Sequence, residues 1–400
     1  MNGSAIEVRP GIYWVGAIDW GLRDFHGYST ELGSTYNAFL VIDEHVTLFD
    51  TVKATHTEEM LWRISQVIDP QRIDTIVVNH AEMDHSGSLG RMVETIRPER
   101  IFASPACEKA LKAHFHYRDW PVRVVKTGDR LNLGKRNVTF LETRMLHWPD
   151  SMFSFLEEDG LLISSDAFGA HYASSERFDD EVETGELMHQ AAKYYANILN
   201  PYSPLVINLL EQVRKLGLKI DMIAPDHGVI WRKDPGRILS AYADWAAQKT
   251  REKVLVVFDS MWHSTEKMAE SVGQGLMEKG VSVQVMDLHG WHRSDVVTEL
   301  LDARGLVLGS PTLNNGMLPR MADMICYAKG LRFTNRVGAA FGSYGWGGEA
   351  VKLLNEALDE MKVRRVHEGL RVQYVPTGED LDRCRELGHT VAAAVLADSH

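Results

Sequence analysis

The segment NHAEMDHSG, residues 79–87, places His80, Glu82, Asp84 and His85 directly after the apolar run IDTIVV. Imidazole and carboxylate side chains at this spacing are typical metal ligands. Side chains alternate on an extended backbone, so we expect His80, Glu82 and Asp84 to converge on one cation. His85 then points elsewhere, as a ligand of a second, adjacent cation would.

Three further candidate ligands follow at the ends of expected strands, in the segments MLHWPDS, ISSDAFG and APDHG: His147, Asp166 and His227. A carboxylate such as Asp166 can bridge two metal ions. The whole pattern therefore indicates a two-metal site built from loops beyond strand ends, where functional residues commonly lie.

The order and spacing of these residues resemble the metallo-β-lactamase fold, in which hydrolases use HxHxDH followed by His, Asp and His. Glu82 stands where those hydrolases have their second histidine. Histidine suits zinc, whereas an oxygen-rich mixed site suits iron or manganese. A carboxylate also stabilises higher oxidation states, so Glu82 favours a redox-active pair, most simply two non-haem iron ions.

The C-terminal part has three loops at the carboxyl ends of expected parallel strands, where a doubly wound sheet binds its ligand. The first loop offers hydroxyl groups and helix-start amides for a phosphate. The third offers Tyr344 and Trp346 to stack on a flat heterocycle. Neither GxGxxG nor GxxxxGK[ST] follows the first strand. The candidate cofactor-binding residues are Ser260, Met261, Trp262, His263, Ser264, Thr265, Pro311, Thr312, Leu313, Asn314, Asn315, Gly316, Ser343, Tyr344, Gly345, Trp346, Gly347 and Gly348.

These loops resemble those of flavodoxin, which hold FMN in the same order, so we expect FMN here. Trp262 and His263 stand where flavodoxins commonly have threonine and glycine. The phosphate would then be held by backbone amides together with Ser260, Ser264 and Thr265.

Two kinds of hydrophobic pattern divide the chain into domains, 1–250 and 251–400. The first has short, irregular strands and several helices, and its resemblance to the metallo-β-lactamase fold implies an αββα sandwich. The second alternates strand and helix in five units of about thirty residues, which predicts a flavodoxin-like, doubly wound parallel sheet of five strands. The fold class is therefore α/β plus α+β.

Composition limits the remaining alternatives. The 400 residues are 44% hydrophobic and 24% charged, with a net charge of −12, which disfavours nucleic-acid binding. We find neither an apolar run long enough for a membrane span nor a secretion signal, so a cytoplasmic location is expected. The three cysteines form no CxxC pair, which disfavours a disulfide framework and a cysteine-ligated metal or Fe–S site.

A metallo-β-lactamase-like domain followed by a flavodoxin-like domain resembles the flavodiiron proteins over nearly the whole chain. The motifs HAEMDH, MLHWPDSM, PDHGVIW, DSMWHSTEKMA, SPTLNNG and FGSYGWGGE carry this resemblance. It is especially close to the rubredoxin:oxygen oxidoreductases of anaerobic sulfate reducers. It implies reduction of O2 to water, of NO to N2O, or both, with electrons passing from rubredoxin or a similar small carrier through FMN to two irons.

The resemblance also implies roles for individual residues. The iron ligands would be His80, Glu82, Asp84, His147, Asp166 and His227, with Asp166 bridging. His85 either binds the second iron or turns aside and leaves a solvent position. His26 and Tyr195 would line the gas pocket and donate hydrogen bonds. The family's head-to-tail arrangement implies a homodimer, or a dimer of dimers.

Two rival interpretations are a di-zinc hydrolase fused to a flavodoxin domain, and an electron-transfer flavoprotein whose metal site is vestigial. Glu82 disfavours the first, because zinc has no redox couple for a flavin to serve. The full ligand set disfavours the second.

Overall fold

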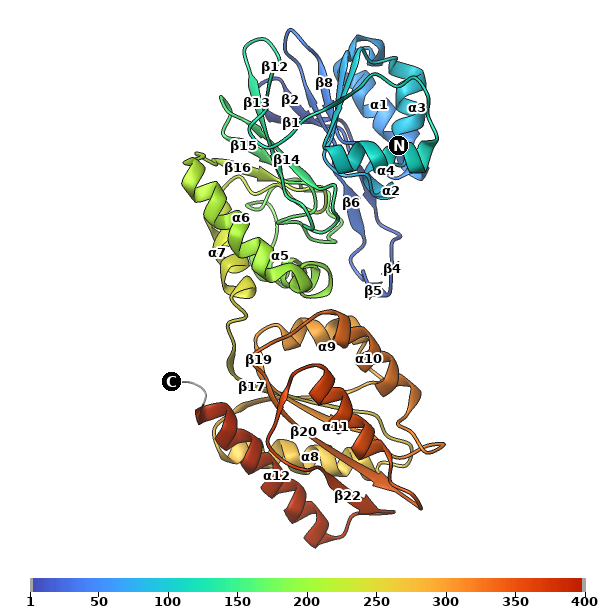
Figure 1. Ribbon diagram of the computed structural model, residues 1–400, viewed down its shortest axis with the longest axis vertical. Helices are drawn as coiled ribbons and strands as arrows, with labels where there is room; N and C mark the ends of the chain where they lie inside the picture. Colours follow the sequence, from blue (N-terminus) through green and yellow to red (C-terminus); the bar gives the residue numbers. More distant parts are fainter. Residues whose placement is uncertain (1–2, 398–400) are drawn as a thin grey trace. The chain divides into compact units, whose positions relative to one another are not determined.

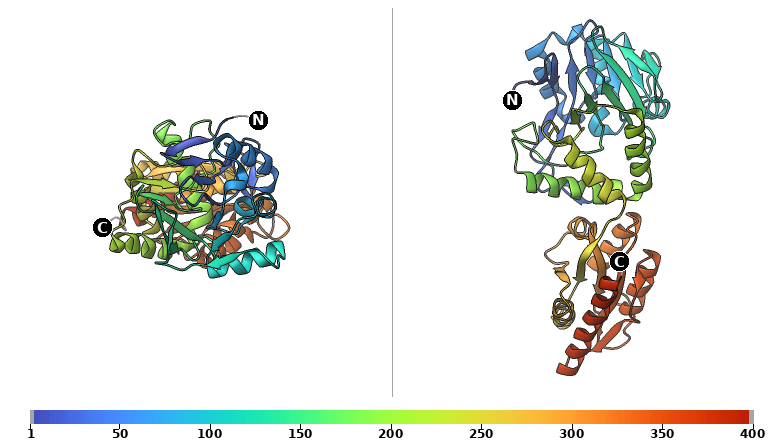
Figure 2. Two further views of the ribbon diagram at one scale, coloured as in Figure 1. Left: turned by 90° about the horizontal axis from the view of Figure 1, so that it is seen from above. Right: turned by 90° about the vertical axis from the view of Figure 1, so that its left-hand side faces the viewer.

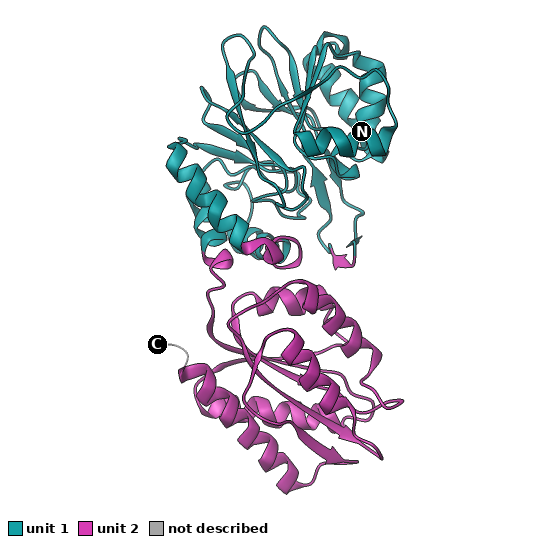
Figure 3. Cartoon of the chain, in the orientation of Figure 1, with its two compact units in different colours: residues 1–26, 30–194, 204–243 teal, residues 27–29, 195–203, 244–400 magenta. Residues whose placement is uncertain are grey.

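The structure is a computed structural model, and it describes residues 3–397 (Figure 1). Contacts divide the chain into two compact units (Figure 3). Unit 1 comprises residues 1–26, 30–194 and 204–243, and unit 2 comprises residues 27–29, 195–203 and 244–400. We propose 250/251 as the boundary of the folding domains, supported by the first strand of the second sheet starting at Arg251.

Unit 1 is built on two facing sheets. The first has seven strands in the order β1-β2-β7-β8-β9-β10-β11, parallel from β8 to β11 and antiparallel before it. Its strands are β1 (Ile6–Arg9), β2 (Ile12–Trp14), β7 (Phe39–Val41), β8 (Thr47–Phe49), β9 (Thr75–Val78), β10 (Arg100–Ala103) and β11 (Val122–Val124).

The second sheet has five strands in sequence order, and its last pair, β15 and β16, is parallel. Its strands are β12 (Arg130–Asn132), β13 (Asn137–Glu142), β14 (Met152–Leu156), β15 (Leu161–Ile163) and β16 (Met222–Ala224). Four short strands lie outside both sheets: β3 (Ala17–Asp19), β4 (Asp24–Phe25), β5 (Tyr28–Ser29) and β6 (Ser34–Tyr36).

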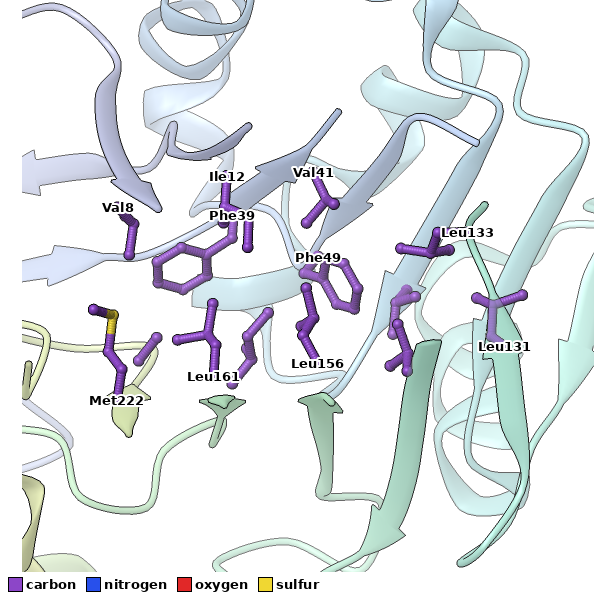
Figure 4. Close-up of a cluster of buried hydrophobic side chains, with 14 of the residues drawn as sticks. Val8, Ile12, Phe39, Val41, Phe49, Leu131, Leu133, Leu156, Leu161 and Met222 are labelled. Carbon is purple, nitrogen blue, oxygen red and sulfur yellow. The ribbon is translucent and has the colours of Figure 1, made fainter. Parts of the chain in front are cut away.

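Alternation along the strands places one core between the sheets and another beneath helices. Phe39 and Phe49 are register partners and point between the sheets toward Leu156 and Leu161 (Figure 4). Their neighbours Leu40 and Leu48, also partners, face the opposite side. Because these strands are buried on both faces, their sequences are nearly continuous apolar runs.

Helices α1, α3 and α4 cover the outer face of the seven-stranded sheet, and α6 lies beside β15 and β16 (Figures 1 and 2). The helices of this part of the chain are η1 (Ala54–His56), α1 (Thr57–Val67), η2 (Pro70–Arg72), α2 (Met83–Ser86), α3 (Leu89–Ile96), α4 (Pro105–Phe115), α5 (Thr184–Tyr194), the π-helix η3 (Tyr195–Leu199), η4 (Asn200–Tyr202), α6 (Ser203–Leu216) and α7 (Pro235–Ala246).

Unit 2 contains a fully parallel sheet in the order β18-β17-β19-β20-β21, with β22 also pairing with β20. The fifth position, expected as one strand, is shared by two short strands that pair with successive stretches of β20. The strands are β17 (Arg251–Phe258), β18 (Ser282–Asp287), β19 (Ala303–Gly309), β20 (Val337–Tyr344), β21 (Arg364–Arg365) and β22 (Leu370–Gln373).

Helices cover both faces of this sheet, as a doubly wound fold requires. Helices α8 and α12 share a core with Val254, Val256 and Val307, while α9 and α11 contact β19 and β20. The helices are α8 (Ser264–Glu278), α9 (Arg293–Leu300), α10 (Pro319–Gly330), α11 (Ala350–Glu360) and α12 (Gly378–Ala397). No helix within residues 3–397 has both the length and the apolarity needed to cross a membrane.

Candidate metal centre and flavin site

The metal-ligand candidates lie beyond the ends of strands from both sheets of unit 1, on loops and on the short helix α2. Strands β15 and β16 are parallel, and Ile163 pairs with Ala224. Asp166 and His227 each come three residues after these partners, so the sheet register delivers both to the same edge. His80 follows β9 of the other sheet, and His147 lies in the turn between β13 and β14.

A first group of donor atoms is formed by His80, Glu82, His147 and one oxygen of Asp166. The Nε2 atoms of His80 and His147 each lie 3.2 Å from Oε2 of Glu82 and 3.2 Å from Oδ2 of Asp166. His80 and Asp166 are fully buried, and Glu82 and His147 retain little exposure.

A second group uses the other oxygen of Asp166. Oδ1 of Asp166 lies 3.2 Å from Nε2 of His85 and 3.4 Å from Nε2 of His227. Asp84 completes the group, 3.4 Å from His85 and 3.3 Å from His227 through its two oxygens. Asp166 therefore contributes one oxygen to each group, which is the arrangement of a bridging carboxylate.

The distances between these donor atoms, and their lack of hydrogen-bond partners, fit a pair of metal ions. Nitrogen and oxygen ligands lie about 2.0–2.2 Å from a transition-metal ion, so two ligands of the same ion stand about 3.0–3.5 Å apart. The observed separations of 3.2–3.4 Å match that range. Among residues 3–397, both oxygens of Asp84, Nε2 of His85 and Oδ2 of Asp166 are buried without a hydrogen-bond partner, as metal-ligand atoms would be.

The grouping corrects the expectation that His80, Glu82 and Asp84 share one cation. Glu82 is the N-cap of the short helix α2, and Asp84 and His85 lie within that helix. Side-chain alternation therefore stops at Glu82, and the helical turn carries Asp84 to the second group with His85. The expectation failed because it assumed an extended backbone through residue 84.

Three buried partners orient the ligands from behind. Oδ2 of Asp150 lies 3.1 Å from Nδ1 of His80 and accepts the N–H of Ala81 at 2.7 Å. Nδ1 of His227 lies 2.6 Å from the carbonyl oxygen of Thr35. The hydroxyl of Tyr194 donates to Oδ1 of Asp166 at 2.9 Å. Such contacts fix the ring and carboxylate orientations that a metal ion requires.

The electrostatics reflect three carboxylates packed among buried histidines. Burial raises the pKa of Glu82, but hydrogen bonds from His147 and His80 outweigh it and lower the pKa to about 2. Burial lowers the pKa of His147, but Asp166 and Glu82 outweigh it and raise the pKa to about 9. The shifts of Glu82 and His147 have opposite signs because each group favours the charged form of the other.

Of the two residues expected to line the gas pocket, His26 lies beside the metal-ligand cluster and Tyr195 does not. Nε2 of His26 lies 3.4 Å from Oε1 of Glu82, and the His26 side chain is 75% exposed. Tyr195 bonds with Ser203 at 2.9 Å and packs against Trp245. The hydroxyl that reaches the cluster belongs to the preceding residue, Tyr194. One residue turns a helix by about 100°, which separates the two hydroxyl groups.

Two residues beside the cluster, His171 and Asp226, are not among the ligands expected from the sequence. His171 is fully buried, with its ring centroid 4.6 Å from that of His227 and its Nδ1 2.8 Å from the Ser34 hydroxyl. Burial and the charge of His227 lower the pKa of His171 well below its usual value. Oδ2 of Asp226 lies 3.7 Å from Nδ1 of His85. Asp226 directly precedes His227 in PDHG, and a search of each motif's neighbours could have found it.

A pocket in unit 2 gathers residues from all three loops expected to hold the cofactor. Tyr374 and Val375, just after β22, also line this pocket and were missed, because no motif in that segment indicates a ligand. The candidates that line the pocket are Met261, Trp262, Ser264, Pro311, Thr312, Ser343, Tyr344 and Gly345.

The remaining candidates shape these loops. Thr265 is buried at the start of α8 and bonds with the Ser343 hydroxyl at 2.9 Å, joining the first and third loops. A tight turn from Leu313 to Gly316 places Asn314 and Asn315 in the left-handed region. Gly347 and Gly348 both have φ of 96°, a conformation that favours glycine. Ser260, with a buried hydroxyl, and His263 lie in the first loop before α8.

Trp262 and Trp346 are 86% and 83% exposed. Large aromatic side chains at such exposure beside a pocket are available to cover a flat ring. The pocket therefore combines a helix start and hydroxyl groups suited to a phosphate with aromatic residues suited to a heterocycle.

Comparison with known proteins agrees with this division of the chain. Residues 35–228 match the ODP family of beta-lactamases, and residues 256–388 match the flavodoxin family. A nitric oxide reductase of Moorella thermoacetica is 47% identical over 393 residues, covering 98% of both chains.

Two solved structures are similar over their full length. The rubredoxin oxygen:oxidoreductase from Desulfovibrio gigas has a TM-score of 0.97 and 46% identity, covering 98% of this chain and 99% of that one. The flavodiiron protein from Giardia intestinalis has a TM-score of 0.96 and 34% identity, covering 99% and 98%.

The fold and the two sites define a metallo-β-lactamase-like domain with a two-metal centre, joined to a flavin-binding flavodoxin-like domain. The chain belongs to the flavodiiron protein family. The expected fold class and family are thereby confirmed.

Proposed function

We propose that this protein is a flavodiiron oxidoreductase that reduces O2 to water, NO to N2O, or both, with electrons delivered by rubredoxin through FMN. The observation that carries the proposal is the pair of ligand groups sharing Asp166, in a chain that also has a flavodoxin domain. The names of the similar proteins from Moorella thermoacetica and Desulfovibrio gigas support this gas chemistry and this donor.

We infer that the metals are iron. His80, Glu82, His147 and Asp166 would hold one ion, and Asp84, His85, His227 and Asp166 the other. The set is rich in oxygen, which suits iron, and its three carboxylates offset most of the charge of two divalent ions. When bound, the iron pair would supply coordination positions for the gas and two of the electrons that reduce the gas.

The surrounding residues have three tasks in this proposal. Asp150 and Thr35 hold the rings of His80 and His227 with Nε2 directed at the metal positions. Tyr194 fixes the bridging carboxylate of Asp166. The exposed His26 stands beside Glu82, where its Nε2–H can donate a hydrogen bond or a proton to a reacting gas.

In unit 2 the amides before α8, with Ser260, Ser264 and Thr265, would hold the FMN phosphate. Tyr344 and Trp346 would flank the ring. When bound, FMN would supply a redox group able to take electrons from the carrier and pass them on singly. Tyr195, buried against Ser203 and Trp245, then has a packing role rather than a place beside the gas.

We further propose a head-to-tail homodimer, or a dimer of dimers, in which the flavin of one chain serves the metals of the other. The two sites stand on separate units of one chain, and electron transfer between distant sites is slow. In the family, a head-to-tail dimer places the flavin of one chain beside the metals of the other. Size-exclusion chromatography with light scattering tests the oligomeric state.

The deciding experiment compares O2 and NO turnover by the wild-type protein and by Glu82→Ala, with reduced rubredoxin as the donor. We expect turnover of at least one gas by the wild type and its loss in a variant that retains FMN. A wild-type protein that holds zinc without iron would favour the fused hydrolase. Unchanged turnover in Glu82→Ala would favour a vestigial metal site.

A further inference from the structure

Unit 1 contains a cavity of about 670 Å³ whose lining includes no residue of the two metal-ligand groups. Its size falls in the range of small-molecule sites. Ile6, Trp14, Ile18 and Trp20 give it mostly apolar walls. We call it the Trp14 pocket. Two arginines, Arg63 and Arg177, also line it.

Both arginines are buried and lie over the same indole ring. Arg63 and Arg177 are each 1% exposed, and the Cζ atom of each lies 4.7 Å from the Trp14 ring centroid. Arg63 is neutralised by Glu59, whose Oε1 lies 2.7 Å from its Nη2. Arg177 forms no such ion pair among the described residues, although the carboxylates of Glu176 and Glu181 are close enough to favour its charged form.

Arg177 leaves two of the nitrogen donors of its guanidinium without a hydrogen bond. Its Nη2 donates to the carbonyl oxygen of Ser174. Its Nε and Nη1 are buried without a hydrogen-bond partner, and no carboxylate of residues 3–397 forms an ion pair with it. Burying an ionic donor without a partner is costly, so a site that keeps one has a use for it.

We propose that the Trp14 pocket binds a small organic acid, with its carboxylate on the Arg177 guanidinium and its apolar body against Ile6, Ile18 and Trp20. The planar guanidinium offers donors that match a carboxylate in geometry. Trp20 is 56% exposed at the pocket and would be covered by the ligand. This site is independent of gas reduction.

The charge state of the arginine fits such a ligand. Burial and the neighbouring Arg63 outweigh the opposing effect of Glu176 and Glu181 and lower the pKa of Arg177 to about 10. The guanidinium therefore remains protonated at neutral pH, and a bound anion would offset the two effects that disfavour its charge.

The test is calorimetric titration of the metal- and flavin-loaded protein with benzoate, benzamide and inorganic phosphate. We expect benzoate to bind at least tenfold more tightly than its neutral analogue benzamide, and more tightly than phosphate. Equal binding of benzoate and benzamide, or no saturable benzoate binding, would overturn the anion site. Phosphate binding as tight as benzoate would overturn the organic-acid assignment.

Three variants locate the binding. Arg177→Met keeps the apolar stem and should weaken benzoate at least tenfold. Arg100→Met is the matched control, since Arg100 also lies over an aromatic ring of unit 1 but is already paired with Asp74; benzoate affinity should stay within twofold. Glu59→Gln removes the pocket's carboxylate and should tighten benzoate severalfold. If Arg177→Met does not fold, unchanged affinity in Glu59→Gln refutes the proposal.

Discussion

Replacing Tyr194 by phenylalanine tests which of two adjacent tyrosines, Tyr194 or Tyr195, supports the metal centre. The change removes one hydroxyl and leaves the buried ring in place. That hydroxyl donates to Oδ1 of Asp166 at 2.9 Å, whereas the hydroxyl of Tyr195 bonds with Ser203. Both side chains are fully buried, so each variant loses a buried contact of similar size.

The two substitutions should differ in effect because the hydroxyl of Tyr194 bonds to a carboxylate and that of Tyr195 to a neutral hydroxyl. A hydrogen bond to an ionised acceptor contributes about 1.5–3 kcal/mol, and loss of a contact behind a metal ligand lowers metal affinity about 10- to 100-fold. Tyr194→Phe should therefore weaken metal binding by one to two orders of magnitude. Tyr195→Phe removes a neutral bond and should cost about 1 kcal/mol of folding stability without changing metal affinity.

The assay is iron release to a chelator of known affinity, measured for the wild type and both variants, with bound flavin and thermal unfolding as internal controls. Faster iron loss in Tyr194→Phe at unchanged flavin content is the expected result. If Tyr195→Phe loses iron or gas turnover while Tyr194→Phe retains both, the assignment of the hydroxyl groups is wrong.

Three further outcomes follow from the structure. Glu82→His should shift metal selectivity toward zinc and lower gas turnover at least a hundredfold, measured by metal analysis and by O2 or NO consumption; full activity with bound iron would contradict this. Burial raises the pKa of Asp43, but backbone amides and a nearby arginine outweigh it and lower the pKa, so its stabilisation is present at neutral pH and lost in acid. The stability gap between the wild type and Asp43→Asn, measured by denaturant unfolding, should therefore close as the pH falls below about 4, and a constant gap would refute it. A Cβ at Gly275 would stand 2.1 Å from a backbone oxygen of α12, whereas one at Gly330 meets nothing within 4 Å; Gly275→Ala should cost about 1–3 kcal/mol and Gly330→Ala should cost nothing, and equal effects would contradict the close helix packing.

The two-domain architecture was predictable because the short, irregular strands of the first part give way to a regular alternation of strands and helices in the second. The parallel sheet of unit 2 follows from regular alternation of strands and helices, although the split of its fifth position between β21 and β22 has no local signal. The family followed from motifs spread along nearly the whole chain.

The metal centre was predictable as a set of residues but not as a geometry. His80, Asp166 and His227 are recognisable as candidate ligands because each follows an apolar strand. The assignment of Asp84 to a group depends on where α2 begins, and the choice between adjacent tyrosines depends on helix phase. His171 and Arg177 come together with their neighbours only through tertiary packing, so no spacing rule could identify them.

The most direct test of the central claim is a single-turnover experiment on the fully reduced, metal- and flavin-loaded protein. Limiting O2 or NO is added anaerobically while flavin reoxidation and products are followed, with Asp166→Asn in parallel. We predict flavin reoxidation with four electrons consumed per O2 and no peroxide, or two per N2O formed, and loss of this reaction in the variant. A wild-type protein that reacts with neither gas, or a variant that reacts at the wild-type rate, would contradict the assignment of gas reduction to the Asp166-bridged centre.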